Sequence, residues 1–300
     1  MPSFRNPRSQ AHHAVQQLRA TGTSRHEHKQ DGRIHSLGTL RNREQSLTRV
    51  AQWLADNRLG ALRDLTPALA RAYLSERAQQ VGQSQLNADR QALQAHLGER
   101  LTLVRSEAER ADRLAERGRA YTPEQVALIT AHQPPHQALA TQIAQAAGLR
   151  AHELLTLRPA NEQPASTHRD WREDRFQGRD GVRYTVVGKG GLIREVCLPA
   201  TLAARLEALR LPVPHTVTDR GIRYQQHYAL GGGQAWSQSF SAASKQVLGW
   251  SAGAHGLRHR YAQARMDELQ GRGHRYSDAR EIVSQELGHF REDITEVYLR

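Results

Sequence analysis

Two short apolar runs around a glycine-rich turn constrain the fold most strongly. Residues 182–187 and 193–198 are rich in apolar and β-branched side chains, and residues 188–191 hold three glycines around Lys189. This pattern is typical of a β-hairpin. Most of the remaining chain repeats its apolar residues with the period of a helix. The sequence therefore predicts a mostly α protein with one small β-sheet.

The N-terminal part of the chain predicts a helical domain over residues 37–118. Thr66 is followed by proline, which is the pattern of an N-cap, and Gly98 is placed to end a further helix. A segment rich in Arg and Glu at 102–117 completes four helices. Residues 1–36 are polar without a regular apolar repeat, so we expect a basic, disordered arm.

A second domain is predicted over residues 121–300. Thr122 and Gln125 have the spacing of a capping box at its first helix. Residues 159–181 and 211–236 are polar or glycine-rich, and we expect both segments to be irregular. Helices are expected over the other segments outside the two strands: 123–132, 136–147, 151–157, 200–210, 238–249, 255–269, 278–287 and 292–299.

The charge balance narrows the class of partner. The chain has 42 Lys and Arg against 30 Asp and Glu, a net charge of +12 and a pI of about 10.6. Such an excess favours polyanions. DNA is favoured over a membrane because no apolar run approaches the roughly 18 residues that a spanning helix needs. No apolar signal core follows Met1. We therefore expect a cytoplasmic, nucleoid-associated protein that binds double-stranded DNA and no membrane.

Neither a metal nor a cofactor is expected. The single cysteine, Cys197, excludes an internal disulfide and a cysteine-based metal site. The N-terminal histidines have no accompanying cluster of cysteines or carboxylates, which argues against a metal site. These histidines are His12, His13, His26, His28 and His35.

Three side-chain types in the C-terminal domain could together move a DNA strand without metal or ATP. A tyrosine phenol that attacks phosphorus conserves the broken bond as a phosphotyrosyl ester. Arginines suit the phosphoryl oxygens because each presents a charged, planar fork of donors. A lysine is the better proton donor to the leaving 5′-oxygen, because arginine pKa values above about 12 hold the proton too tightly. Only three of the 42 basic residues are lysines, which singles out Lys189 at the predicted turn.

The candidate arginines and histidines stand in recognisable local patterns. Arg150 precedes Glu153 by three residues, a spacing that predicts an ion pair. His255 and Arg258 are also three apart and share one face of a helix start. For His259, the next residue in this run, both a structural role and a phosphate contact are open.

These motifs resemble those of the tyrosine recombinases, the phage-integrase type of DNA-rearranging enzyme. Residues 255–259 match the run of that family almost as written, and Tyr298 follows His289 by nine positions, as the nucleophile of the family does. The segment from Arg150 to Lys189 and the stretch after Arg258, around residues 271–275, look longer than in compact members of the family, and in this the chain resembles the integrases of integrative conjugative elements. The resemblance implies six catalytic positions: Arg150, Lys189, His255, Arg258, His289 and Tyr298.

The resemblance also implies roles and partners. Tyr298 would be the nucleophile and Lys189 the general acid, while the two arginines would clamp the phosphate and the two histidines would assist proton transfer. The helical domain would be a SAM-like, core-binding DNA clamp, and the C-terminal domain an α+β catalytic domain. Members of the family work as homo-tetramers on two DNA sites. Accessory DNA-bending or directionality proteins are further candidate partners.

Alternatives stay open at this stage. One is a catalytically silent DNA-binding protein on the same fold, a second is a type IB topoisomerase-like enzyme that relaxes DNA, and a third is a basic structural protein. Only Leu299 and Arg300 follow Tyr298, where members of the family commonly have a further helix that docks on a neighbouring subunit. The mode of assembly and the target DNA sequence are therefore open as well.

Overall fold

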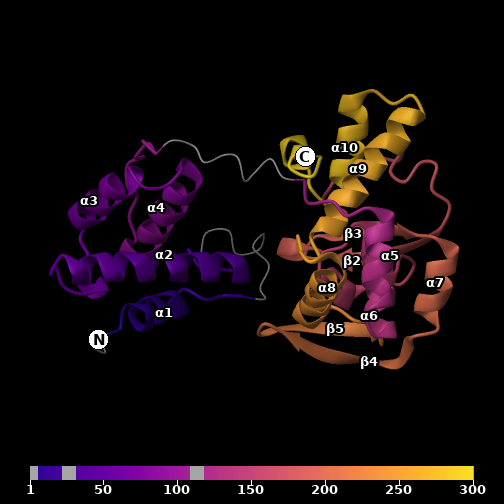
Figure 1. The fold of residues 1–300 in the computed structure, drawn as a ribbon, viewed down its shortest axis with the longest axis horizontal. Helices are drawn as coiled ribbons and strands as arrows, with labels where there is room; N and C mark the ends of the chain where they lie inside the picture. The colour runs from indigo at the N-terminus through magenta and orange to yellow at the C-terminus, as the bar shows by residue number, and fades with distance from the viewer. Residues whose placement is uncertain (1–5, 22–31, 109–117, 300) are drawn as a thin grey trace. The chain divides into compact units, whose positions relative to one another are not determined.

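The chain forms two compact units, Met1–Ala115 and Glu116–Arg300 (Figure 1). A computed structural model describes residues 6–21, 32–108 and 118–299. Each unit has its own buried apolar core. Helices predominate and the sheets are small and antiparallel, so the predicted mostly α fold is confirmed. None of the helices in these residues is both long enough and apolar enough to cross a bilayer.

Four α-helices in the described part of the first unit surround one core. Thr66 caps one of them as predicted, because its hydroxyl accepts the N–H of Leu69 at 3.3 Å. Gly98 ends another in the left-handed conformation, with a φ of 73°. The helices are α1 (Pro7–Gln17), α2 (Leu37–Asp56), α3 (Pro67–Ala78) and α4 (Gln83–Leu97), with a short 3-10 helix at Leu62–Asp64.

The expectation of a disordered arm over residues 1–36 is wrong where the structure describes it. Asn6 caps α1 through its side chain, which accepts the N–H of Arg8 at 2.8 Å. Ala11 and Val15 are fully buried, and α1 packs against α2. Two small apolar residues four apart are enough to anchor one face of a short helix, and this signal is easily lost among polar neighbours.

The helix expected over residues 102–117 is also absent from its described part. Leu101 is buried in the core, and the chain then continues to residue 108 without helix. Ser106 donates its N–H to the side chain of Gln83 at 2.9 Å, so side chains of α4 satisfy this backbone in place of a helical ladder. Residues 109–117 lie outside the described part of the chain.

The helices of the second unit follow the prediction closely. The capping box of Thr122 and Gln125 is present, with hydrogen bonds of 3.0 and 3.3 Å in the two directions. The residues predicted as a short helix at 151–157 form a 3-10 helix, Glu153–Thr156. The α-helices are α5 (Pro123–Ala131), α6 (Pro135–Ala147), α7 (Ala200–Glu207), α8 (Gly233–Leu248), α9 (Gly256–Gly271), α10 (Tyr276–Glu286) and α11 (Glu292–Glu296).

The predicted hairpin forms the centre of a three-stranded antiparallel sheet. Strands β2 (Val182–Val187) and β3 (Ile193–Leu198) pair along their whole length, with Val187 opposite Ile193 next to the turn. Strand β1 (Arg158–Pro159) adds to the other edge of β2. The inward side chains of this sheet join the main core of the unit, which places the turn with Lys189 at the edge of that core.

The segment 211–236, expected to be irregular, contains a second hairpin, and that expectation is wrong. Strands β4 (Arg210–Asp219) and β5 (Ile222–Tyr228) pair in an antiparallel manner. Arg220 and Gly221 join them with φ values of 51° and 81°, as a tight hairpin turn requires. The prolines of β4 lie in the stretch where the register shifts, so they remove no donor from the regular ladder. Because proline argues against a strand, the sequence pattern did not indicate this one.

Candidate functional site

Arg150 is positioned by the turn that ends α6. Gly148 in this turn is left-handed, with a φ of 60°, and a Cβ there would lie 2.8 Å from the ring of Tyr261. Glycine is therefore required for α6 and α9 to pack this closely. Arg150 Nη1 then pairs with Oε1 of Glu153 at 2.7 Å, and the Arg150 N–H donates to Oε2 at 2.9 Å. The ion pair predicted from the spacing is confirmed.

Glu153 is a fully buried carboxylate that holds two arginines. Its Oε2 also accepts from Arg194 Nη2 at 2.8 Å, and Arg194 Nη1 donates to the carbonyl of Glu286 at 2.5 Å. Burial alone would raise the pKa of Glu153, but Arg194 and then Arg150 outweigh it and hold that pKa well below its usual value. The carboxylate therefore stays ionised and fixes the Arg150 side chain.

Sequence reasoning missed Arg194. This residue alternates along β3 with Val196 and Leu198, and all three side chains are buried. An arginine on the apolar face of a strand needs an anionic or carbonyl partner, because an unpaired buried charge is very costly. The alternation is therefore the signal in the sequence that points to a buried ion pair.

Arg258 lies in the first turn of α9 and is fully buried. Its guanidinium donates to the carbonyl of Gly148 at 2.5 Å and to the carbonyl of Leu287. Burial and the nearby charge of Arg150 lower the pKa of Arg258. The two carbonyls thus orient the Arg258 guanidinium. Within the described residues, no carboxylate forms an ion pair with it.

His289 connects the two arginines. It follows α10 after Gly288, and its Nε2 accepts from Arg150 Nη2 at 2.8 Å and from Arg258 Nη2 at 3.1 Å. Burial, then Arg258 and Arg150, lower the pKa of His289 to about 3, so the ring is neutral at pH 7. Because Nε2 accepts both bonds, the proton of the neutral ring lies on Nδ1.

Tyr298 follows α11 and packs against this cluster with only 7% of its surface exposed. Its ring centroid lies 5.4 Å from that of His289, and the guanidinium carbon of Arg258 lies 5.4 Å from the same centroid. Gln263 of α9 donates its side-chain amide to the Tyr298 carbonyl at 3.3 Å. The candidate nucleophile therefore lies in the same site as the two arginines, within a single chain.

Two further imidazoles line the tyrosine. The ring centroids of His255 and His259 lie 5.4 and 4.8 Å from that of Tyr298. Desolvation, followed by the charge of Arg258, lowers the pKa of His255 to about 4. Desolvation, followed by the charge of Arg119, lowers the pKa of His259 to about 4. Both rings are therefore neutral at pH 7, and His259, whose role the sequence left open, is the nearest imidazole to Tyr298.

Lys189 is the one candidate that the structure does not bring into contact with the others. It is exposed at the tip of the β2–β3 turn and has no hydrogen bond or ion pair with any described residue. The backbone beside it is close to the site, because a Cβ on Gly188 would lie 3.4 Å from Oε1 of Glu153 and 4.0 Å from Nη1 of Arg150. The lysine therefore stands at the rim of the cluster.

The arrangement is suited to an oxyanion next to a phenol. Arg150 keeps 20% of its side chain exposed, so an anion from solvent can reach its guanidinium. Planar guanidinium donors bind phosphate oxygens in a bidentate manner. Within the residues that the structure describes, no three His, Cys, Asp or Glu side chains are grouped to hold a metal ion.

Comparison with known proteins finds similar solved structures. No protein-family model and no curated protein matches the chain. The XerH site-specific recombinase, in a post-cleavage complex with palindromic difH substrate, is 14% identical and has a TM-score of 0.57 over 100% of this chain and 94% of its own. The Tn1549 transposon integrase, bound to transposon right end DNA, is 13% identical with a TM-score of 0.51, over 97% of this chain and 94% of its own.

A third similar structure is the lambda integrase tetramer bound to a Holliday junction. It is 16% identical with a TM-score of 0.51, over 95% of this chain and 79% of its own. All three likenesses cover at least 95% of the chain and therefore extend through both units. The chain therefore has the fold of the tyrosine recombinases.

Proposed function

We propose that this protein is a site-specific DNA recombinase that cuts and rejoins double-stranded DNA through a 3′-phosphotyrosyl intermediate. The observation that carries the proposal is the position of Tyr298, which packs against Arg258 and His289 in one site. The recombinase fold adds independent support. The net charge of +12 suits a partner with a phosphate backbone.

In the proposed cleavage step, the Tyr298 oxygen bonds to phosphorus and the bond from phosphorus to the 5′-oxygen breaks. Lys189 donates a proton to that leaving oxygen, and an imidazole accepts the proton of the phenol. Of the two histidines among the candidate catalytic residues, His255 is the better acceptor, because Nε2 of His289 already accepts two guanidinium donors. Rejoining reverses each transfer, so neither metal nor ATP is consumed.

The two arginines would bind the non-bridging oxygens of the phosphate. Their guanidinium groups share one imidazole acceptor, so they are close enough to contact oxygens of one phosphate. Charge that develops on these oxygens would be stabilised by guanidinium groups that protein partners already orient, and such stabilisation is usually the main source of rate enhancement. His289 would keep both donors aligned while the phosphate binds.

The proposed assembly is a homo-tetramer on two DNA sites. The lambda integrase structure is a tetramer on a Holliday junction, and the XerH structure holds a palindromic substrate. The first unit would form one half of a clamp around the duplex, and the second unit, which carries the candidate site, would form the other half. Accessory DNA-bending or directionality proteins are candidate partners beyond this assembly, and cytoplasmic, nucleoid-associated localisation follows from the DNA partner.

A nicked suicide duplex tests this function directly. The binding site is first selected from random-sequence duplexes, and the duplex is nicked one base from each candidate cleavage position so that the released strand diffuses away. Wild-type protein should form a covalent adduct that survives SDS gel electrophoresis, and Tyr298→Phe should bind the same duplex without an adduct.

This experiment, a plasmid-relaxation assay and a salt titration of binding together separate the alternative functions. Binding without any adduct from the wild-type protein would mean a catalytically silent DNA-binding protein. Relaxation of supercoiled plasmid of arbitrary sequence would mean a topoisomerase-like enzyme. Binding that ignores sequence and falls steeply with salt would mean a basic structural protein.

A further inference from the structure

The long segment between β1 and β2 bonds to the hairpin that carries Lys189. Ser166 donates its N–H to the carbonyl of Ile193 and accepts the Ile193 N–H on its hydroxyl, both at 3.0 Å. Thr185 of β2 donates its hydroxyl to the carbonyl of Gln163 at 2.9 Å. We call residues 163–179 the bridging loop, since one end of it is fastened to the first residue of β3, four positions after Lys189.

The other end of the bridging loop is fastened to α10. The N–H of Arg172 donates to the side chain of Gln285 at 2.8 Å, and its guanidinium pairs with Glu281 at 2.7 Å. The N–H of Phe176 donates to the buried carboxylate of Glu286 at 2.8 Å. These contacts lie within one and a half turns of the end of α10, just before His289.

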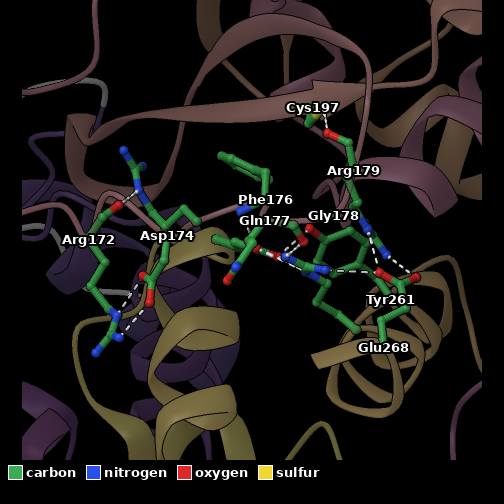
Figure 2. Close-up of polar contacts among 12 residues, drawn as sticks. Arg172, Asp174, Phe176, Gln177, Gly178, Arg179, Cys197, Tyr261 and Glu268 are labelled. Atoms are coloured by element: carbon green, nitrogen blue, oxygen red, sulfur yellow. Dashed lines mark hydrogen bonds and ion pairs between the residues drawn. The ribbon is translucent and has the colours of Figure 1, made fainter. Parts of the chain in front are cut away.

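Contacts with α9 extend the attachment. Figure 2 shows Arg179 joined to Glu268, with hydrogen bonds of 2.7 and 2.8 Å, and the Arg179 guanidinium lies 4.8 Å from the ring centroid of Tyr261. Arg265 donates to the carbonyl of Gln177 at 3.0 Å and pairs with Glu286, where all the side-chain atoms of the pair are buried. The loop is therefore fixed to α9, which carries Arg258, and to α10, which ends just before His289.

Trp171 joins the two attachments. Its ring packs edge-on against Phe290, the residue after His289, with centroids 4.9 Å apart. Its Nε1 donates to the carbonyl of Ser166 at 2.8 Å, and Ser166 in turn bonds to Ile193. The guanidinium of Arg175 lies 4.4 Å from the Trp171 ring centroid and also pairs with Glu195 of β3 at 3.3 Å. One indole thus links the chain beside His289 to the chain beside Lys189.

We propose that the bridging loop, through Trp171, positions the Lys189 turn against the cluster of Arg150, Arg258 and His289. The inference rests on the proposed function, in which Lys189 acts on the leaving oxygen. Lys189 has no partner of its own in the described residues, so its distance from the cluster depends on the backbone that carries it. Proton transfer needs the two groups within hydrogen-bond reach, and a misplacement of about 1 Å can cost about 10²-fold in rate.

The test uses two nicked substrates that differ in one atom. In the first the leaving atom is the ordinary 5′-oxygen, and in the second it is a bridging 5′-sulfur, which needs little protonation. Trp171→Phe keeps an aromatic ring and removes the hydrogen bond to Ser166, and Trp171→Ala removes both. We expect adduct formation with the oxygen substrate to slow by about 10-fold for the first and about 10²-fold for the second.

The decisive result is the ratio of the two rates. With the sulfur substrate both Trp171 variants should form adduct at the wild-type rate, as Lys189→Ala should. Trp250→Ala, which removes an exposed indole elsewhere in the same unit, should keep the wild-type ratio. A merely structural role would distort the arginine cluster and slow both substrates equally, because an intact cluster is needed whichever atom leaves.

Equal slowing on both substrates, or no slowing on either, would overturn the positioning role while the wild-type adduct upholds the proposed function. A wild-type protein that forms no adduct with either substrate would refute the proposed function and the inference together. Trp171→Phe keeps the comparison interpretable if Trp171→Ala does not fold, because it retains the ring against Phe290.

Discussion

The two sides of the proposed site are held in opposite ways. On one side Arg150 and Arg258 both donate to His289, and Arg150 is also held by a buried carboxylate and Arg258 by main-chain carbonyls. On the other side Lys189 is exposed, and it is followed by Gly190 and Gly191, whose φ values are 81° and 83°. Under the proposed function, this contrast would mean that the phosphate-binding half is formed in advance and that the proton-donating half is completed when the turn is positioned.

This difference separates two kinds of contribution to catalysis. Donors fixed in advance stabilise charge without rearrangement, so their removal should disturb both stability and rate. An exposed general acid contributes through its position and its proton, so its removal should affect rate alone. Four predictions test this division.

The largest effect is expected from Lys189→Ala. Loss of a general acid should slow adduct formation with the oxygen substrate by about 10²–10⁴-fold. The sulfur substrate should restore the rate, and the urea midpoint should stay at the wild-type value because the side chain is exposed and without partners in the described residues. A defect that the sulfur substrate does not rescue would remove Lys189 from the acid role.

Glu153→Gln should cost most in stability. The change leaves Arg150 and Arg194 without the buried charge that pairs with both, and breaking such a pair typically costs about 3–5 kcal/mol. Urea denaturation measures the free energy of unfolding. The matched control is Glu162→Gln, which breaks an ion pair with Arg210 at the surface and should cost at most about 1 kcal/mol. Equal losses in the two variants would contradict a preformed arginine half.

Arg258→Lys should slow cleavage by about 10²–10³-fold, the usual cost of losing one donor that stabilises transition-state charge. A lysine retains the charge but cannot reproduce the planar fork that bonds Gly148, Leu287 and His289 together. DNA affinity in a gel shift should change far less than the cleavage rate. Arg205→Lys, an exposed control, should cleave as the wild type does. A fast Arg258→Lys enzyme would show that charge alone suffices.

The smallest expected effect is on how the free energy of unfolding of the DNA-free protein depends on pH. The pKa of His289 is lowered to about 3 in the folded state, so below about pH 6.5 the unfolded chain binds a proton that the folded chain does not. Stability should therefore fall as pH drops from 7 to 5, by at most about 1.4 kcal/mol per pH unit for this group. His289→Gln should show a shallower fall in urea denaturation. A slope identical to that of the wild type would mean that His289 is not held neutral.

Local chemistry made much of the second unit predictable. Strands β2 and β3 follow from their apolar runs and the glycines between them, and α5 follows from its capping box. The pairing of Arg150 with Glu153 follows from helical spacing. These features depend on residues that are neighbours in sequence, so one chain suffices to find them.

Long-range pairing limited the rest. Arg194 is held by Glu153, 41 positions away, and by the carbonyl of Glu286, 92 positions away. No local spacing in the sequence indicates partners at such distances. The β4–β5 hairpin was hidden by prolines that fall where its register shifts. The buried face of α1 rests on two small residues whose partner is another helix. In each case tertiary packing decides the structure.

Mass spectrometry of the covalent adduct tests the central claim most directly. After nuclease and trypsin digestion, the peptide spanning residues 292–300 contains a single tyrosine, Tyr298. We predict that this peptide carries the phosphate-linked nucleotide through the Tyr298 oxygen. A nucleotide found on any other residue, with an unmodified 292–300 peptide, would contradict the account.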